Sequence, residues 1–215
     1  NNNHGQIYSG RALEFDGVTD YLDTGMTGLT SGGKFTVAGW FYLDSTQQNY
    51  AAVWSIADWE TASLRGITIR YNNSGTDLSV TTGKAGTSTY GSQYIIDNSD
   101  NDSFQGLKNS WHRYVVVVDS DASGDTAATS TNLYCYIDGV LVVNEDFDST
   151  PTHFQSENGQ SFWIGRSYVN ASESYCSMKA SDVQFWDKAW TQEDATYDYL
   201  NPEQLVLNRG GTSLT

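Results

Sequence analysis

The chain has 215 residues and a net charge of −15, because 26 acidic side chains face only 11 basic ones. This balance argues against a nucleic-acid partner, since binding to the phosphate backbone depends on clustered Lys and Arg. No apolar run approaches the ~20 residues that a membrane-spanning helix needs. The length suits one all-β domain, in which Gly, Ser, Thr, Asn and Asp separate short apolar runs.

Period-two alternation with β-branched and aromatic residues recurs along the chain between turn signals, and it predicts nine or more short strands. Neither face of the run 35–43 is frankly polar, so we expect this strand in the middle of a sandwich. Four strand tryptophans, Trp40, Trp54, Trp111 and Trp186, are expected in the core. The predicted strands are 11–15, 35–43, 51–57, 66–71, 77–82, 114–119, 132–143, 162–167 and 181–186.

An acidic turn follows the first predicted strand, in the stretch ALEFDGVTD (12–20). Apolar and acidic side chains alternate there until Gly17 breaks the pattern. We favour a structural turn in which Asp16 and Asp20 accept hydrogen bonds from local backbone N–H groups. The alternative is a contribution to a calcium site, which Asp182 could join. Catalysis by these acids would need a raised pKa in a dry cleft, which an edge turn does not offer.

A second acidic segment, DSDASGD (119–125), resembles the start of a calcium loop. Asp119, Asp121 and Asp125 alternate with small residues, and hard cations prefer such oxygen ligands around a sharp glycine turn. The twelfth position is Ser130 rather than a bidentate Glu, which should weaken binding. A calcium site and a plain solvated loop both remain open here.

Other local signals indicate loops, one hairpin and one helix. The polar segments 83–110 and 119–131 are predicted to be long loops. Asp138-Gly139 predicts a tight hairpin of type I′, because Gly supplies positive φ freely. The run TQEDATYDYL (191–200) has a capping Thr followed by acidic residues, so it predicts one short helix.

The cysteines and histidines do not form a recognisable reactive site. Cys135 and Cys176 both alternate with large apolar neighbours, so we expect two buried thiols, with a single cross-strand disulfide as the alternative. The three histidines, His4, His112 and His153, lie far apart in the sequence, and no Ser-His-Asp arrangement can be argued from it. His112 is expected to pack or form hydrogen bonds at the start of a strand.

Aromatic residues are abundant, at 13% of the chain, and they are the composition feature that says most about a possible ligand. Sugar rings stack their C–H faces on Trp and Tyr, while neighbouring amides and acids accept hydrogen bonds from the hydroxyl groups. Neutral glycans suit an acidic chain better than anionic ones. The candidate ligand-binding residues, all predicted in loops or at the rim, are Trp59, Tyr90, Tyr94, Tyr168 and Asn170.

Six segments follow one another in an order and spacing that resembles the laminin-G-like and pentraxin-like branch of the concanavalin A-like lectin and glucanase superfamily. This resemblance implies an all-β fold, a two-sheet antiparallel jelly-roll sandwich with ligand sites on the concave sheet or the rim loops, and often a bound calcium ion. Our helix signal adds one short helix near the C-terminus. The segments are ALEFDGVTDYL, KFTVAGWFYLD, SWHRYVVVVD, NLYCYIDGVLV, FWIGRS and SDVQFWDKAWTQED.

The chain also departs from relatives within that superfamily. The segment SYVNASESY (167–175) contains one acid, Glu173, whereas pentraxins place several calcium-binding acids in this loop. The Glu-x-Asp-x-x-Glu run of the glucanase relatives, which would place two carboxylates ~5 Å apart on one sheet face, is absent from the sequence. We therefore expect a protein that is not an enzyme.

Together these patterns predict a laminin-G-like domain over residues 1–200 and a tail or linker over 201–215. We expect a lectin-like module that binds surface glycans, with or without the assistance of calcium, within a larger extracellular or virion-surface protein. The stretch 181–205 resembles segments of tailed-phage virion proteins, which favours the virion. The alternative is a structural, decoration or oligomerisation module that binds no glycan. Neither nucleic acid nor membrane insertion is expected.

Overall fold

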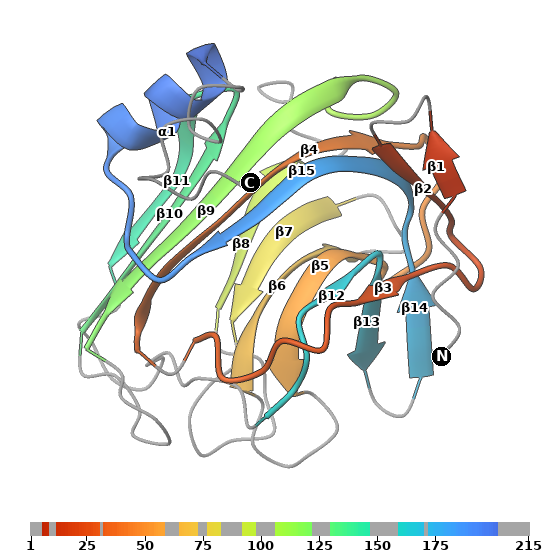
Figure 1. The fold of residues 1–215 in the computed structure, drawn as a ribbon, viewed down its shortest axis with the longest axis horizontal. Helices are drawn as coiled ribbons and strands as arrows, with labels where there is room; N and C mark the ends of the chain where they lie inside the picture. Colours follow the sequence, from red (N-terminus) through yellow and green to blue (C-terminus); the bar gives the residue numbers. More distant parts are fainter. Residues whose placement is uncertain are drawn as a thin grey trace, which may run out of the picture.

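The computed structural model describes residues 6–8, 12–30, 32–58, 65–72, 77–82, 92–97, 106–121, 130–146, 159–169 and 172–201. These residues form two large antiparallel sheets packed face to face, a two-stranded sheet at one end and a single short helix (Figure 1). The predicted all-β jelly-roll sandwich is confirmed.

The larger sheet has seven strands and contains both the first and the last strand of the described chain. The strand that continues into the C-terminal helix, β15, lies between β2 and β4, so segments far apart in sequence pair directly. In order across the sheet the strands are β1 (Gln6–Tyr8), β2 (Ala12–Asp16), β15 (Ser177–Trp186), β4 (Lys34–Leu43), β9 (Trp111–Ser120), β10 (Thr131–Ile137) and β11 (Val140–Asp146).

The second sheet has six strands, and a hairpin of two further strands lies beside it. Strand β8 falls inside the segment 83–110, which we predicted as loop, so that prediction is wrong there; its Gln-Tyr-Ile-Ile core pairs with β7. In order the six strands are β3 (Leu22–Asp23), β12 (Trp163–Ile164), β5 (Ala52–Asp58), β6 (Arg65–Asn72), β7 (Asp77–Thr82) and β8 (Ser92–Asp97). The hairpin comprises β13 (Arg166–Val169) and β14 (Ser172–Tyr175).

The main core lies between the two sheets. Alternate residues of each strand point inward, and burial of each large apolar side chain contributes roughly 1.5–3 kcal/mol. Cys135 and Cys176 belong to this core as free thiols, as predicted, and burial raises the pKa of both. The largest apolar members are Phe15, Phe35, Phe41, Leu43, Trp54, Ile56, Ile67, Tyr71 and Tyr114.

A smaller core lies on the opposite face of the seven-stranded sheet, under α1 (Gln192–Leu200) (Figure 1). The predicted helix is confirmed, with Thr191 as its cap in a capping box with Asp194. Trp40 and Trp186 are only partly buried on this side, and Trp111 is 37% exposed. Of the four tryptophans predicted in the core, Trp54 alone is fully buried between the sheets, because the period of two does not show which face a helix covers.

A buried ion pair fixes this helix to the sheet. Arg113 of β9 donates from Nε to Asp198 Oδ2 at 2.6 Å and from Nη2 to Asp198 Oδ1 at 3.0 Å. Both side chains are 0% exposed. Such a pair gains geometric specificity from its two parallel hydrogen bonds.

Candidate functional site

The structure brings together a serine, a histidine and an aspartate that the sequence did not connect. His112 Nδ1 lies 2.7 Å from Asp138 Oδ2 in the β10–β11 hairpin, and His112 Nε2 lies 2.8 Å from Ser110 Oγ. The Gly106 carbonyl, however, is 2.9 Å from Ser110 Oγ and 3.1 Å from Nε2. A carbonyl can only accept, so it competes with the imidazole for the hydroxyl proton. The cluster fits a hydrogen-bonded clamp better than an activated nucleophile, as we predicted for His112.

The same hairpin confirms the turn prediction. Asp138 and Gly139 both have positive φ, at 52° and 76°, as a type I′ turn requires. Asp138 Oδ1 also accepts the Arg113 backbone N–H at 2.8 Å, which ties the turn to β9.

A concave site with polar and aromatic walls lies at the end of the sandwich where β2, β14 and β15 meet. This polar pocket encloses about 240 Å³. Its walls are the turn after β2, the segment between β4 and β5, and the junction between β14 and β15. Its lining residues are Asp16, Gly17, Thr46, Gln47, Gln48, Tyr175 and Ser177.

Gln47 builds the floor of the polar pocket, and its side chain is fully used in doing so. Its Nε2 donates to the carbonyls of Asp44, at 3.0 Å, and Ser177, at 2.6 Å. Its Oε1 accepts the Ser177 N–H at 3.1 Å and the Cys176 thiol at 3.4 Å. Because the residue is only 8% exposed, these bonds hold the β4–β5 segment rigidly against the start of β15.

Asp16 shapes the second wall. Its Oδ1 accepts backbone N–H groups from Val18 and Thr19, each at 2.8 Å, and from Asp20 at 3.0 Å. Desolvation acts to raise the pKa of Asp16, but these hydrogen bonds outweigh it and the pKa is lowered. Asp16 is therefore an ionised acceptor at neutral pH. The predicted turn is present, with Asp16 as its acceptor and Asp20 contributing a backbone donor.

Gly17 is the point of closest approach between this turn and β15. Its φ is +71°, and a Cβ atom there would lie 2.8 Å from Ser177 Cβ. Its carbonyl accepts a hydrogen bond from Gln48 Nε2 at 2.8 Å. Glycine is therefore required at this position by both its backbone conformation and its neighbours.

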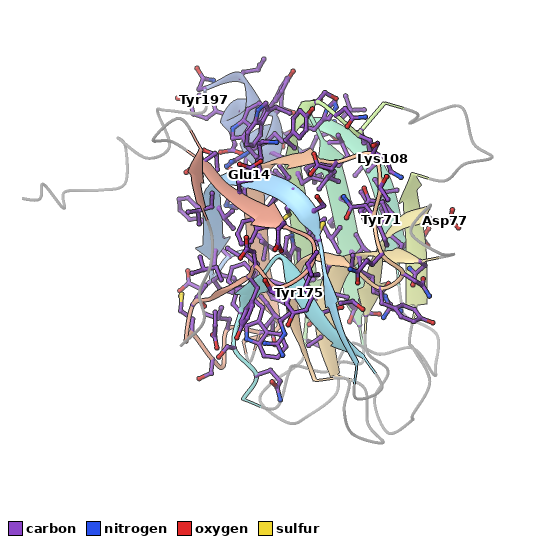
Figure 2. The ribbon with its side chains drawn as sticks, turned by 90° about the vertical axis from the view of Figure 1, so that its right-hand side faces the viewer. Glu14, Tyr71, Asp77, Lys108, Tyr175 and Tyr197 are labelled. Carbon is purple, nitrogen blue, oxygen red and sulfur yellow. The ribbon has the colours of Figure 1, made fainter. Side chains whose placement is uncertain are left out.

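Tyr175 lines the polar pocket with its aromatic ring and is labelled near the middle of the view in Figure 2. Its ring lies 6.1 Å from that of Tyr21 in a tilted pair. The Arg166 guanidinium lies 4.5 Å from the ring centroids of both Tyr21 and Trp163, a distance at which cation–π attraction operates. These contacts link Tyr175, Tyr21, Arg166 and Trp163 into one cluster beside the polar groups of the pocket.

The face of the six-stranded sheet that points away from the main core carries buried hydroxyl and amide side chains. Asn72 Nδ2 donates to Ser79 Oγ at 2.6 Å, Ser79 Oγ lies 3.3 Å from Thr81 Oγ1, and Thr68 Oγ1 donates to the Trp54 carbonyl at 2.7 Å. These polar side chains are buried. They bond to one another and to the sheet, so the polar pocket is the better candidate for ligand contact.

The residues predicted to bind a ligand are placed as follows. Trp59, Tyr90 and Asn170 lie outside the described residues. Tyr94 and Tyr168 lie in strands, β8 and β13, rather than in loops. The role of all five residues in ligand binding therefore stays a prediction. The polar pocket was missed because its residues come together only through the pairing of β15 with β2 and β4.

The predicted calcium loop is described in part. Asp119 forms an ion pair with Lys34 at 2.6 Å, and Asp121 Oδ1 accepts the Ser130 N–H at 2.9 Å. Asp125 lies outside the described residues. The two visible carboxylates thus have partners of their own, and calcium binding by this loop stays a prediction.

The other predicted calcium ligands also have protein partners. Asp182 Oδ2 accepts hydrogen bonds from Arg113 Nη1 at 3.1 Å and from Gln184 Nε2 at 2.7 Å. Asp16 accepts the N–H groups of its own turn. Among the residues that the structure describes, no three acidic, histidine or cysteine side chains gather in a way that could hold a metal ion. Calcium binding at Asp16, Asp20 and Asp182 stays a prediction.

Comparison with known proteins identifies the fold. A family model described as "Concanavalin A-like lectin/glucanases superfamily" matches residues 16–196, whereas no curated protein matches by sequence. A heptameric pentraxin from Limulus polyphemus superposes with a TM-score of 0.57 at 15% identity, covering 87% of this chain and 81% of the pentraxin.

Receptor-binding domains of botulinum neurotoxins are also similar. The type G domain superposes with a TM-score of 0.61 at 12% identity and covers 93% of this chain. The C/D mosaic domain superposes with a TM-score of 0.62 at 13% identity and covers 92% of this chain. The chain spans 44% and 45% of those two domains. These identities show a shared fold alone. The described part of the chain contains no helix long and apolar enough to cross a membrane.

Proposed function

Since this chain belongs to the concanavalin A-like lectin/glucanases superfamily, we propose that it is a non-enzymatic, lectin-like module that binds neutral surface glycans at the polar pocket. The observation that carries the proposal is the combination there of an aromatic ring, an ionised carboxylate and side-chain amide and hydroxyl groups on a rigid floor. A larger extracellular or virion-surface protein is the context we propose for the module.

The chemistry of the polar pocket suits a sugar ring. Tyr175 offers a face for the C–H side of the ring, and Asp16 is an acceptor for hydroxyl donors. Thr46 and Gln48 are exposed at the opening and add a hydroxyl and an amide. The net charge of −15 opposes sialylated or sulfated glycans, so we expect preference for neutral ones.

Calcium is not required by this site, because the Asp16 Oδ1 atom already accepts three N–H groups. When bound elsewhere, for example in the predicted loop 119–125, the ion would supply positive charge and open coordination positions for sugar hydroxyls. We expect that a chelator leaves binding at the polar pocket unchanged.

A glycan array followed by calorimetry tests the proposal. Tyr175→Ala should weaken the strongest hit roughly tenfold, since aromatic contacts contribute about 0.5–1.5 kcal/mol beyond area burial. Tyr197→Ala is the matched control, because Tyr197 is also partly exposed but lies on α1. Trp59→Ala tests the competing rim-loop site.

Three outcomes would overturn the proposal. Glycan binding that Tyr175→Ala leaves intact but Trp59→Ala abolishes would move the site to the rim. Silence across a diverse array would favour a structural or oligomerisation module. Release of reducing sugar that is lost on replacing an acid by its amide would establish an enzyme.

A further inference from the structure

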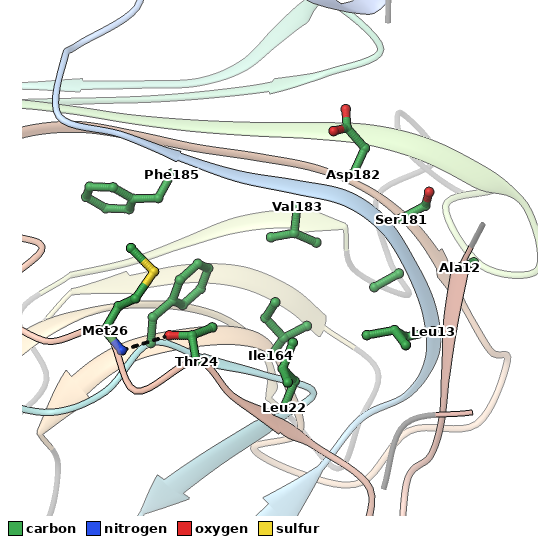
Figure 3. Close-up of a pocket in the computed structure, with 12 residues that line it drawn as sticks. Ala12, Leu13, Leu22, Thr24, Met26, Ile164, Ser181, Asp182, Val183 and Phe185 are labelled. Carbon is green, nitrogen blue, oxygen red and sulfur yellow. Dashed lines mark hydrogen bonds between the residues drawn. The ribbon is translucent and has the colours of Figure 1, made fainter. Parts of the chain in front are cut away.

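A second cavity, lined mainly by apolar side chains, lies between the two sheets and encloses about 540 Å³ (Figure 3). We propose that it binds the aliphatic chain of a neutral amphiphile. This inference is independent of the proposed glycan binding, because the cavity and the polar pocket share no lining residue. Its apolar lining residues are Ala12, Leu13, Leu22, Met26, Phe162, Ile164, Ala180, Val183 and Phe185.

The cavity lies beside an irregularity in β15. The register of β15 against β4 shifts between Ser181 and Gln184, and Asp182 adopts a positive φ of 48°. Gly39 of β4 does not add to this space, because a Cβ there would lie 2.7 Å from Phe41 Cε2 and 3.2 Å from Val183 Cγ2. Bulges and a small residue such as Ala180 leave space that regular strands with larger side chains would fill.

The polar groups in the lining already have partners within the protein. Thr24 Oγ1 accepts the Met26 N–H at 3.1 Å. Asp182 pairs with Arg113, and its carboxylate points away from the cavity while Val183 points into it (Figure 3). A sugar or peptide would therefore lose its own hydrogen bonds on entering, whereas a hydrocarbon chain loses none.

The volume of the cavity and the charge of the protein narrow the class of ligand further. The volume falls within the ~300–1,000 Å³ of ordinary ligand pockets. An apolar space of this kind gains dispersion contacts when a chain fills it. The protein carries a charge of −15, so an anionic headgroup at the mouth is disfavoured. Met26, which is 46% exposed, provides a flexible side chain at the opening.

Binding of straight-chain alcohols, followed by NMR of the Ile164 and Met26 methyl groups, tests the proposal. We expect those signals to shift, and the affinity to rise about fourfold for each added methylene from hexanol to decanol, which corresponds to 0.8 kcal/mol per buried CH₂. The anion octanoate should bind more weakly than octanol.

Two variants and one control locate the site. Ala180→Phe fills the cavity and should abolish binding. Met26→Ser, at the opening of the cavity, should weaken binding several-fold. This variant tests the proposal if Ala180→Phe does not fold. Val140→Ser is the control, because Val140 is 60% exposed on β11 and should bind as wild type. Shifts at other methyl groups only, affinity independent of chain length, or unchanged binding by both cavity variants would overturn the inference.

Discussion

The polar pocket and the apolar cavity lie along the same strand, β15, yet they have opposite chemistry. At the start of β15, Gln47 reaches across from the β4–β5 segment and satisfies the backbone of Ser177. A few residues later, the irregularity around Asp182 opens a space lined by hydrocarbon. The comparison teaches that the groups satisfying the backbone, rather than the strand itself, decide which ligand a gap can accept.

The largest effect is expected at Arg113, which links the irregularity in β15 to α1. Arg113→Met should lower the free energy of unfolding by about 4 kcal/mol, because it removes the guanidinium that compensates the charge of the buried Asp198 carboxylate. Urea denaturation measures this loss. The double variant Arg113→Met/Asp198→Leu should recover most of it, and a single variant within 1 kcal/mol of wild type would contradict the account.

Gln47→Leu should cost about 3 kcal/mol, since it removes the hydrogen bonds that Gln47 supplies to the Asp44 carbonyl and the Ser177 N–H, both partly buried. Gln48→Leu is the matched control, because Gln48 is exposed and its side chain makes one described hydrogen bond, to the Gly17 carbonyl. Thermal unfolding and glycan titration of the two variants distinguish a role of Gln47 in the floor of the polar pocket from a role of Gln48 at its surface. Equal losses in the two variants would show that Gln47 does not build the floor.

Gly17→Ala should destabilise the protein by about 2 kcal/mol, whereas Gly25→Ala should cost only about 1 kcal/mol. Both glycines have positive φ, but an added Cβ meets Ser177 only at Gly17 and has nothing within 4 Å at Gly25. The difference between the two measured free energies isolates the close approach at the polar pocket. No difference would mean that strain, rather than packing, explains Gly17.

The smallest effect is the pH dependence of the Asp16 turn. Its pKa in the folded protein is lowered, so the stabilisation is present above pH 3.8, the ordinary value, and is lost as pH falls through the folded pKa. Asp16→Asn should therefore lose less stability than wild type between pH 5 and pH 2. Parallel acid-unfolding curves for the two proteins would contradict this.

The sequence allowed prediction of what depends on neighbouring residues. Most of the long strands, the Asp138-Gly139 hairpin and the capped helix after Thr191 follow from local periodicity or turn chemistry, whereas β8 was predicted as loop. The polar pocket does not, because Gln47 and Ser177 are 130 residues apart in the chain. Trp111 was misplaced for a related reason, since alternation identifies a strand but not what covers each face of it.

The central claim is that glycan recognition occurs at the polar pocket, and an NMR titration of the ¹⁵N-labelled protein with the strongest array hit tests it most directly. We predict that the amide signals that shift most belong to residues 16–17, 46–48 and 175–177. Shifts concentrated instead on the predicted rim residues Trp59, Tyr90 and Asn170, with those segments unmoved, would contradict the account.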